Sequence, residues 1–236
     1  MRPDRFETFW EGARAAIPIC VAFFAITFAL GIAAHASGVT LAELSLMSAL
    51  VFAGPAQFPA VDLLPLGGHG LQIILGTFFI NLRFAIMGFA LSPHFKGIRR
   101  GAMLFSAQLI SLSTFALSFL RFQRRSDASN LAYFLGVAIP SYTVYLLGTV
   151  LGYLVGLGIP TGFEEGIRFI FPGYLTALLA AELREPRTIL LVVIAFLTTP
   201  LCEAVVPGWG LIVNAVVVAT VAVGVETWSE NGSPLS

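Results

Sequence analysis

The sequence carries very little charge for its length. Charged residues make up 11% of its 236 residues and hydrophobic residues 57%, whereas soluble domains usually contain roughly 25% charged residues. A soluble fold of this size could not cover its surface with so few charges. The formal net charge is zero, and no basic patch interleaved with aromatic residues is present, so no nucleic-acid partner is expected.

Cysteine is also scarce. Cys20 and Cys202 lie far apart in apolar runs, which excludes a disulfide framework and a CxxC metal or redox motif. The motifs typical of metalloproteases and serine hydrolases, HExxH and GxSxG in a suitable context, are missing as well. We therefore expect no metal, no cofactor and no enzymatic activity.

Long apolar runs dominate what the sequence does contain. A helix needs ~20 apolar residues to cross the hydrocarbon core of a bilayer, and several runs approach or exceed that length. The predicted fold is an all-α polytopic membrane protein, a single transmembrane domain with about seven to eight transmembrane helices. The predicted segments are 15–36, 44–64, 71–91, 102–120, 131–157, 167–183, 188–206 and 209–226.

The residues before the first segment do not look like a cleavable signal peptide. They include several acidic residues, and the apolar run that follows is too long for a signal sequence. One helical face of this stretch is apolar, since Phe6, Phe9, Trp10 and Ala13 recur at helical spacing. This pattern predicts a short amphipathic helix lying on the membrane surface.

Lysine and arginine gather at the N-terminus, at Lys96–Arg100 and at Arg121–Arg125. Cytoplasmic loops of membrane proteins are enriched in these residues, and this bias favours a cytoplasmic N-terminus. If all segments span, however, the group at Lys96–Arg100 falls outside. Whether segments 44–64 and 167–183 span or re-enter therefore stays open.

A weak internal repeat divides the chain into two halves, about 15–120 and 131–228. Gly/Pro-interrupted segments at corresponding positions of two halves are typical of transporters whose site lies at the repeat interface. The alternative is that glycine and proline are simply common in membrane helices. The matching positions are Pro18 and Pro140, Glu43 and Glu165, and the breaks at Gly54–Pro55 and Pro172–Gly173.

The stretch VFAGPAQFPAVDLL, residues 51–64, predicts a broken helix at membrane depth. Pro55 removes a backbone donor, and freed backbone groups at this depth require surrounding protein or a water-filled cavity. A half-helix that begins near Pro55 would point its positive end at that cavity. Gly54, Pro55 and Gln57 are therefore candidate groups for binding a carboxylate, such as that of an amino acid. A proline kink that serves packing alone is the alternative.

Arg83 lies near the middle of segment 71–91, two residues after Asn81. A central arginine is disfavoured by ~2.5–3.5 kcal/mol on insertion scales, so it should face a cavity or a partner. Arg83 is therefore expected to bind substrate or to form a buried structural pair; the alternative is that its side chain extends to the membrane surface, which arginine does best near a helix end. Glu203 is one candidate counter-charge, and Asp62 is the competitor.

Segment 102–120 contains a stripe of hydroxyl residues. Ser111, Thr114 and Ser118 fall on one helical face. Such a stripe allows helices to approach closely and to bond to one another, or it lines a polar path. Ser111 and Thr114 are accordingly candidate substrate-binding residues.

The run FAGPAQFPAVDLL, followed by FFINLRF and LSP, resembles the AzlC family, the large subunits of bacterial branched-chain amino-acid exporters. Gly54, Gln57, Asn81, Leu82 and Arg83 match the family pattern. The match is most specific across residues 50–120 and looser over most of the chain. It implies an exporter of branched-chain or other hydrophobic amino acids in the bacterial inner membrane, which works by alternating access with a small AzlD-like membrane subunit as partner. A channel or a non-transporting assembly subunit is the alternative.

One departure from the family concerns segment 102–120. Many members carry a Thr-Asp-Glu run where this chain has Ser111–Thr114, so both acidic residues are missing. If those carboxylates couple transport to protons in relatives, this protein couples differently or not at all. The remaining candidate coupling carboxylates are Glu43, Asp62, Glu165 and Glu203.

Overall fold

The computed structural model describes residues 5–64, 70–95, 97–124, 130–159, 186–206 and 209–231, with isolated positions between 166 and 183. Within these residues all regular structure is helical, which confirms the predicted all-α class. The chain folds as two compact units, Met1–Phe171 and Pro172–Ser236. The predicted division into repeated halves, 15–120 and 131–228, stays a prediction.

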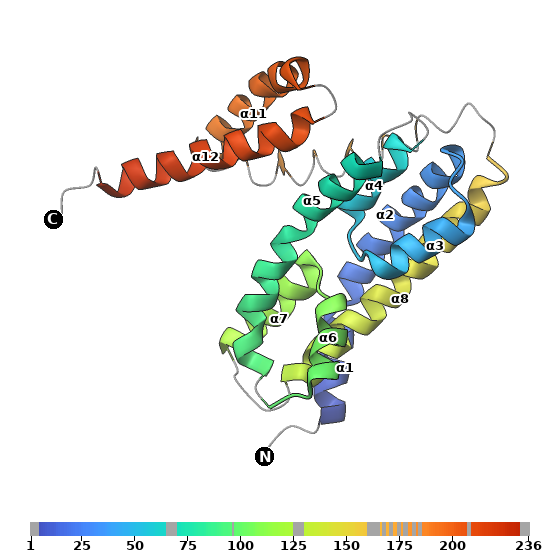
Figure 1. The fold of residues 1–236 in the computed structure, drawn as a ribbon. Helices are drawn as coiled ribbons and strands as arrows, with labels where there is room; N and C mark the ends of the chain where they lie inside the picture. Colours follow the sequence, from blue (N-terminus) through green and yellow to red (C-terminus); the bar gives the residue numbers. More distant parts are fainter. Residues whose placement is uncertain are drawn as a thin grey trace. The chain divides into compact units, whose positions relative to one another are not determined.

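The first unit contains eight α-helices and one 3₁₀ helix among its described residues (Figure 1): α1 (Arg5–Ala15), α2 (Ile17–Ala36), α3 (Leu41–Leu50), α4 (Gly54–Leu63), α5 (Gly70–Leu91), η1 (Ser92–Phe95), α6 (Arg100–Gln108), α7 (Leu112–Arg124) and α8 (Asn130–Gly156). The second unit contains α11 (Pro186–Val205) and α12 (Gly210–Asn231).

Four of the described helices are long and apolar enough to cross a membrane: Ile17–Ala36, Ile73–Phe95, Asn130–Gly156 and Thr188–Val205. The predicted count of about seven to eight spans is therefore not confirmed. Segments 44–64 and 102–120 each form two short helices, and most of segment 167–183 lies outside the described residues, including the neighbours of Pro172–Gly173.

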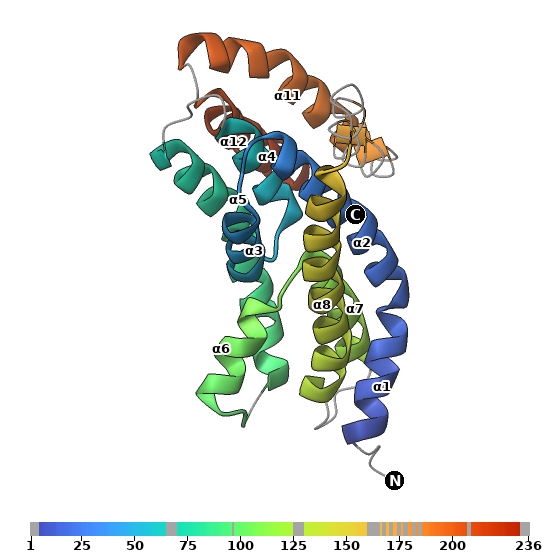
Figure 2. The same cartoon turned by 90° about the vertical axis from the view of Figure 1, so that its right-hand side faces the viewer.

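The helices α2 and α8 form the most extensive helix–helix contact of the first unit and run side by side in the same direction (Figure 2). Glycines let them touch through their main chains. A Cβ atom added at Gly152 would lie 2.0 Å from the carbonyl oxygen of Phe28, and one at Gly31 would lie 2.2 Å from that of Thr149. Gly148, Gly152 and Gly156 recur at every fourth position of α8, the spacing that allows close helix packing in membranes.

The helix α1 differs from the predicted interfacial helix. Its last turn continues into α2 through hydrogen bonds from Ala16 N to Gly12 O and from Cys20 N to Ala16 O, and it packs along α8. Its buried face consists of the small residues Thr8 and Gly12, whereas Phe6 and Trp10 are exposed. Small residues are required on this face because Gly12 lies directly against the backbone of Tyr133 and Gly136.

The helices α3 and α4 form a hairpin whose two ends lie at the same end of the unit. Leu44 near the start of α3 and Val61 near the end of α4 share one apolar cluster with Leu30 of α2. The tip, Val51–Ala53, lies deeper, where Phe52 packs against Phe23 at a ring distance of 5.5 Å. Segment 44–64 therefore turns back instead of spanning.

The helices α6 and α7 form a second hairpin that enters from the opposite end (Figures 1 and 2). The end of α7 is held there by Arg121, which donates two hydrogen bonds of 3.1 Å to the Glu11 carboxylate. The tip, Leu109–Ser111, reaches the middle of the unit, where Ile110 lies beside Gly88 of α5. The prediction that segment 102–120 is one spanning helix is therefore wrong.

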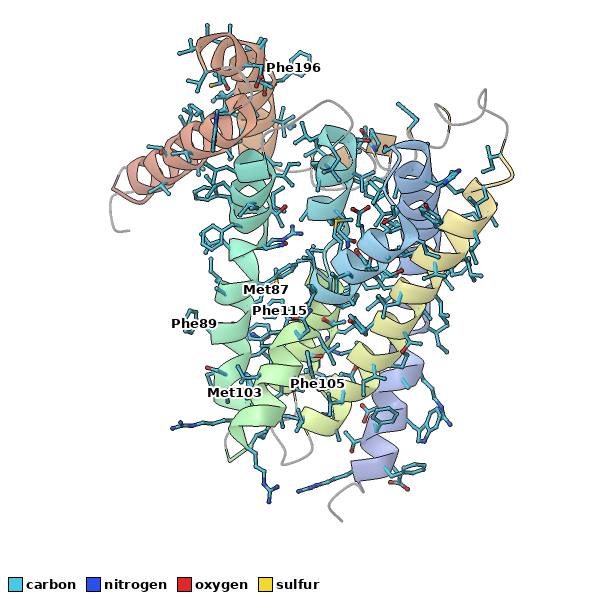
Figure 3. All side chains as sticks on the ribbon, turned by 45° about the vertical axis from the view of Figure 1, so that its right-hand side comes forward. Met87, Phe89, Met103, Phe105, Phe115 and Phe196 are labelled. Atoms are coloured by element: carbon cyan, nitrogen blue, oxygen red, sulfur yellow. The ribbon has the colours of Figure 1, made fainter. Side chains whose placement is uncertain are left out.

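The first unit thus repeats one arrangement twice in opposite directions: a long helix followed by a helical hairpin. The helix α2 precedes hairpin α3–α4, and α5 precedes hairpin α6–α7. Figure 3 shows Met87 on α5 and Phe115 on α7 pointing toward each other, while Phe89 points away. The tips of both hairpins lie inside the unit, Phe52 of the first against Phe23 and Ile110 of the second beside Gly88 of α5.

Among the described residues of the second unit, α11 and α12 pack against each other as an antiparallel pair. Asn214 of α12 donates hydrogen bonds to Thr199 Oγ1 at 2.7 Å and to Ala195 O at 3.1 Å. The Thr198 hydroxyl donates a hydrogen bond to the Asn214 side-chain oxygen at 2.5 Å. These bonds hold the two helices together, since amide groups in an apolar surrounding need partners.

Candidate functional site

The break between α3 and α4 lies where the sequence predicts it. Val51–Ala53 is extended, and α4 begins at Gly54 with Pro55 in its first turn. Proline is tolerated there because the first backbone N–H groups of a helix have no intrahelical partner. Gly54 packs near Ile26 of α2 and the hydroxyl of Tyr145 of α8.

The carbonyl groups that the break leaves at the end of α3 are bonded by side chains from two other helices. Tyr142 of α8 donates a 2.7 Å hydrogen bond to Ala49 O. Gln108, the last residue of α6, donates to Leu50 O at 2.8 Å and to Ala49 O at 3.2 Å. The tips of the two hairpins are thereby joined through Gln108.

Gln57 is fully buried and connects three helices. Its Nε2 donates a 3.0 Å hydrogen bond to Ser48 Oγ of α3, and its Oε1 accepts a hydrogen bond from the Tyr145 hydroxyl of α8. The side chain that was predicted to contact substrate is thus bonded on both ends of its amide to protein groups. Its first role in this structure is to hold hairpin α3–α4 against α8.

Replacing Gln57 by leucine should therefore destabilise the protein more than removing either partner. Leucine leaves both Ser48 and Tyr145 buried without their hydrogen bonds to Gln57, and each buried unsatisfied group lowers the free energy of unfolding by about 1–3 kcal/mol. Ser48→Ala and Tyr145→Phe each remove only one of these two hydrogen bonds. Thermal unfolding of the purified variants in detergent measures the difference. Equal stability of Gln57→Leu and Ser48→Ala would contradict this role.

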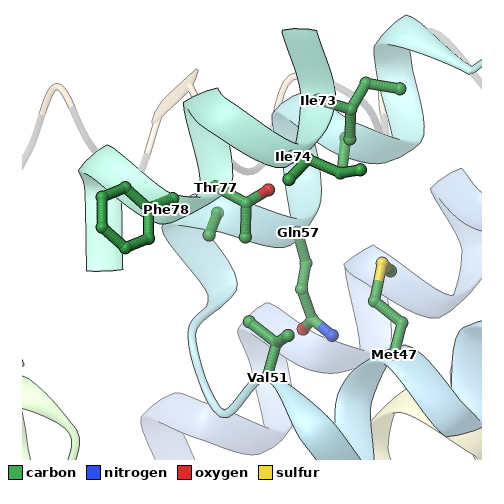
Figure 4. A pocket seen from close by; sticks show the side chains of 9 residues that line it. Met47, Val51, Gln57, Ile73, Ile74, Thr77 and Phe78 are labelled. Carbon is green, nitrogen blue, oxygen red and sulfur yellow. The ribbon is translucent and has the colours of Figure 1, made fainter. Parts of the chain in front are cut away.

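A pocket of about 360 Å³ lies between hairpin α3–α4 and the first half of α5 (Figure 4). Its walls are largely aliphatic, and the only hydrogen-bonding side chains among them are those of Gln57 and Thr77. In Figure 4 the Gln57 amide points toward Met47 and Val51, below Ile73 and Ile74. The lining residues are Met47, Val51, Ala56, Gln57, Ala60, Ile73, Ile74, Thr77 and Phe78.

Asn81 and Arg83 lie farther along α5. The Asn81 Oδ1 atom is buried and has no hydrogen-bond partner among the described residues. The Arg83 guanidinium lies 5.2 Å from the centre of the Phe84 ring, a distance at which the ring attracts a cation. Thr77 of α5 lines the same pocket as Val51 of the first hairpin tip, and Gly88 of α5 lies beside Ile110 of the second tip. Asn81 and Arg83 lie between these two positions along α5.

Ser111 and Thr114 cap α7. Thr114 N donates to Ser111 Oγ at 3.2 Å, and Ser111 N donates to Thr114 Oγ1 at 2.8 Å. This reciprocal pair satisfies backbone donors that a helix start leaves open. Both side chains are buried, so the hydroxyl stripe at these positions stabilises the break between α6 and α7.

The candidate coupling carboxylates occupy different places. Glu43 forms a capping box with Thr40 at the start of α3, and the hydrogen bonds from the Thr40 hydroxyl and backbone N–H hold the pKa of the exposed Glu43 below its ordinary value. Asp62 is exposed near the end of α4, and Glu203 is exposed in α11 of the second unit. Glu165 lies outside the described residues. Glu43 and Asp62 thus belong to hairpin α3–α4 of the first unit, and Glu203 belongs to the second unit.

Arg83 belongs to the first unit and Glu203 to the second, and their pairing stays a prediction. Within the described residues, no group of three or more His, Cys, Asp or Glu side chains could hold a metal ion. Cys20 and Cys202 are both free thiols.

Sequence reasoning missed the residues that hold the two hairpin tips: Ser48, Gln108, Tyr142 and Tyr145. No motif marks them. Gln108 and Tyr142 donate to backbone carbonyls, Tyr145 donates to Gln57 88 positions earlier, and Ser48 accepts a hydrogen bond from Gln57 nine positions later. The break at Leu109–Ser111 was missed too, since it contains neither glycine nor proline. Its signal is the Ser-x-x-Thr spacing of Ser111 and Thr114, which is a capping pattern.

The comparisons with known proteins agree with this membrane fold. The inner membrane protein YgaZ of Escherichia coli (strain K12) is 23% identical over 186 residues, 77% of this chain and 76% of that protein. An uncharacterized membrane protein of Archaeoglobus fulgidus is 30% identical over 148 residues, 63% of either protein. No solved structure matches the chain. The family model described as AzlC protein matches residues 18–159, from α2 through α8. As this match spans more than half of the sequence, the chain belongs to the AzlC family.

Proposed function

We propose that the protein is a secondary transporter of the bacterial inner membrane that exports branched-chain or other hydrophobic amino acids. The observation that carries this proposal is the aliphatic pocket beside a broken helical hairpin, with Asn81 and Arg83 on the next turns of α5. Broken helices around a central site are typical of secondary transporters. The pocket volume of about 360 Å³ falls in the ordinary range for small-molecule sites.

The spacing along α5 suits a zwitterion with an apolar side chain. A helix rises by about 1.5 Å per residue, which places Asn81 ~6 Å beyond Thr77 on the same face of α5 and Arg83 ~9 Å beyond it on a different face, from which its long side chain would have to reach around the helix. A substrate carboxylate at Arg83 would leave the aliphatic side chain within reach of the pocket, and the buried Asn81 oxygen would accept a hydrogen bond from the amino group. Arg83 is the favoured group because a guanidinium binds a carboxylate through two parallel hydrogen bonds.

Two further parts of the proposal follow from family membership. The protein resides in the inner membrane, the location given in the name of its Escherichia coli relative. It works together with a small AzlD-like membrane subunit.

The hairpins support a cytoplasmic N-terminus. The helices α1 and α8 begin at one end of the first unit, where α5 ends and hairpin α6–α7 opens, so the described arginines of Arg5–Arg14, Arg99–Arg100 and Arg121–Arg124 share that end. The described residues that follow α2, α4 and α8 at the other end, 37–40, 64 and 157–159, include no lysine or arginine. Such one-sided charge is the pattern of a cytoplasmic face.

Cysteine labelling in whole cells tests this orientation. In a variant without Cys20 and Cys202, we expect a membrane-impermeant thiol reagent to label Ala42→Cys and to leave Arg100→Cys and Arg124→Cys unlabelled until the membrane is opened. An arrangement in which segments 44–64 and 102–120 both span would instead expose Arg100→Cys on the outside.

Uptake of labelled leucine, valine, isoleucine and methionine into everted vesicles tests the function, with and without the small subunit. We expect saturable uptake and counterflow, in which internal unlabelled substrate accelerates entry of the label. A channel would show weak saturation and no counterflow, and an assembly subunit would show neither. The same assay at different pH gradients reports whether protons drive transport without the acidic pair of segment 102–120.

A further inference from the structure

The helix α6 is attached to the rest of the first unit more loosely than its hairpin partner. Over most of its length its side chains are exposed, with Met103 at 40%, Leu104 at 74% and Phe105 at 56%. The helix α7, in contrast, packs against both α5 and α8. The hydrogen bonds of Gln108 to the end of α3 are the contacts that close the tip of α6 against the other hairpin.

The connection between α6 and α7 has the features of a hinge. Leu109–Ser111 interrupts the helical hydrogen bonding, and α7 starts with its own reciprocal cap, Ser111 with Thr114. The start of α7 is therefore stabilised whether or not α6 stays in place. At the far end of α7, Arg121 anchors it to Glu11 of α1 and lies 4.5 Å from the centre of the Tyr133 ring.

We propose that α6 is a gate on the arginine-rich side of the transporter and that Gln108 is its latch. Swinging α6 about Leu109–Ser111 would withdraw Gln108 from Ala49 and Leu50, the residues directly before Val51, which lines the pocket. Hairpin α3–α4 would keep its place, because Gln57 and Tyr142 hold it to α8 independently of α6. This assignment rests on the proposed transport function, and its tests do not require transport.

Tyr142 offers a matched control, since it donates to the same carbonyl, Ala49 O, from the fixed helix α8. Ser106 of α6 is a suitable reporter, because only 2% of it is exposed and cysteine is of nearly the same size. Ser118 of α7 is fully buried and reports general loosening of the hairpin. In purified protein without Cys20 and Cys202, we measure the rate at which a thiol reagent modifies Ser106→Cys or Ser118→Cys.

We expect Gln108→Ala to raise the modification rate of Ser106→Cys at least fivefold and to leave that of Ser118→Cys unchanged. Tyr142→Phe should change neither rate by more than twofold. An unchanged Ser106→Cys rate in Gln108→Ala, an equal rise at both reporters, or an equal effect of Tyr142→Phe would each overturn the latch.

Hydrogen–deuterium exchange is measured on the unaltered protein, so its result does not depend on whether a variant folds. Amides of residues 104–108 in α6 should exchange at least tenfold faster than those of residues 116–122 in α7. Equal protection of the two helices would overturn the gate. Because neither measurement involves substrate, loss of transport in the vesicle assay would leave both results interpretable.

Discussion

Replacing Gly152 by alanine is expected to destabilise the protein strongly. Among the described glycines at which α2 and α8 touch, we expect this position to lose the most stability when a methyl group is added. The added carbon would lie 2.0 Å from the carbonyl oxygen of Phe28 and 2.8 Å from its Cα. Both atoms belong to the main chain, so no side-chain rotation relieves the clash and α2 has to move away from α8. Overpacking of a tight contact costs about 1–3 kcal/mol.

Gly76→Ala is the matched control for this substitution. Gly76 lies within α5, and a Cβ there meets nothing within 4 Å. Alanine is favoured over glycine in a helix by roughly 0.5–1 kcal/mol, so the two substitutions should shift the unfolding temperature in opposite directions. Thermal unfolding in detergent measures both. An unfolding temperature of Gly152→Ala equal to that of the unaltered protein would show that the two backbones do not touch.

Replacing Arg83 by alanine should reduce amino-acid export by at least about tenfold. A hydrogen bond to a charged group contributes about 1.5–3 kcal/mol, which corresponds to roughly 10–150-fold in binding. Arg83→Lys should lose less, because lysine keeps the charge but lacks the planar fork that binds a carboxylate through two donors. The measurement is the initial rate of leucine uptake into everted vesicles, corrected for the amount of protein.

Arg14→Ala is the control, since Arg14 is an exposed arginine in the last turn of α1. It should transport normally. An Arg83→Ala protein that also transports normally would refute the assignment of the substrate site. Replacing Arg83 and Glu203 singly and together separates a substrate role from an ion pair, because additive losses would exclude a direct pair.

The sequence predicted those features of the fold that depend on local chemistry. Pro55 cannot donate a backbone hydrogen bond, and together with Gly54 it marks the start of α4. The break at Leu109–Ser111 could not be found in the same way, because it depends on a reciprocal cap between two ordinary polar residues. The stripe formed by those residues fitted an uninterrupted helix equally well.

The candidate site was only partly predictable for a related reason. Gln57 and Asn81 stand out as amides in apolar segments, but their neighbours come from distant parts of the chain. The partner of Gln57 on α8 is Tyr145, and tyrosines are common near membrane interfaces. Which aromatic residue reaches which amide depends on the parallel contact of α2 with α8, and the glycine spacing in α8 was the available signal for that contact.

The parallel contact of α2 with α8 also determines when the two hairpins can mature during synthesis. Tyr145 follows Gln57 by 88 positions, and Ser141 follows its neighbour Cys20 by 121. Hairpin α3–α4 therefore emerges from the ribosome long before the helix that supplies its hydrogen-bond donors. Until α8 arrives, the Gln57 side-chain oxygen lacks its Tyr145 donor and the Ala49 carbonyl lacks its Tyr142 donor. The arrival of α8 is therefore the step that completes the hydrogen bonds of the first hairpin.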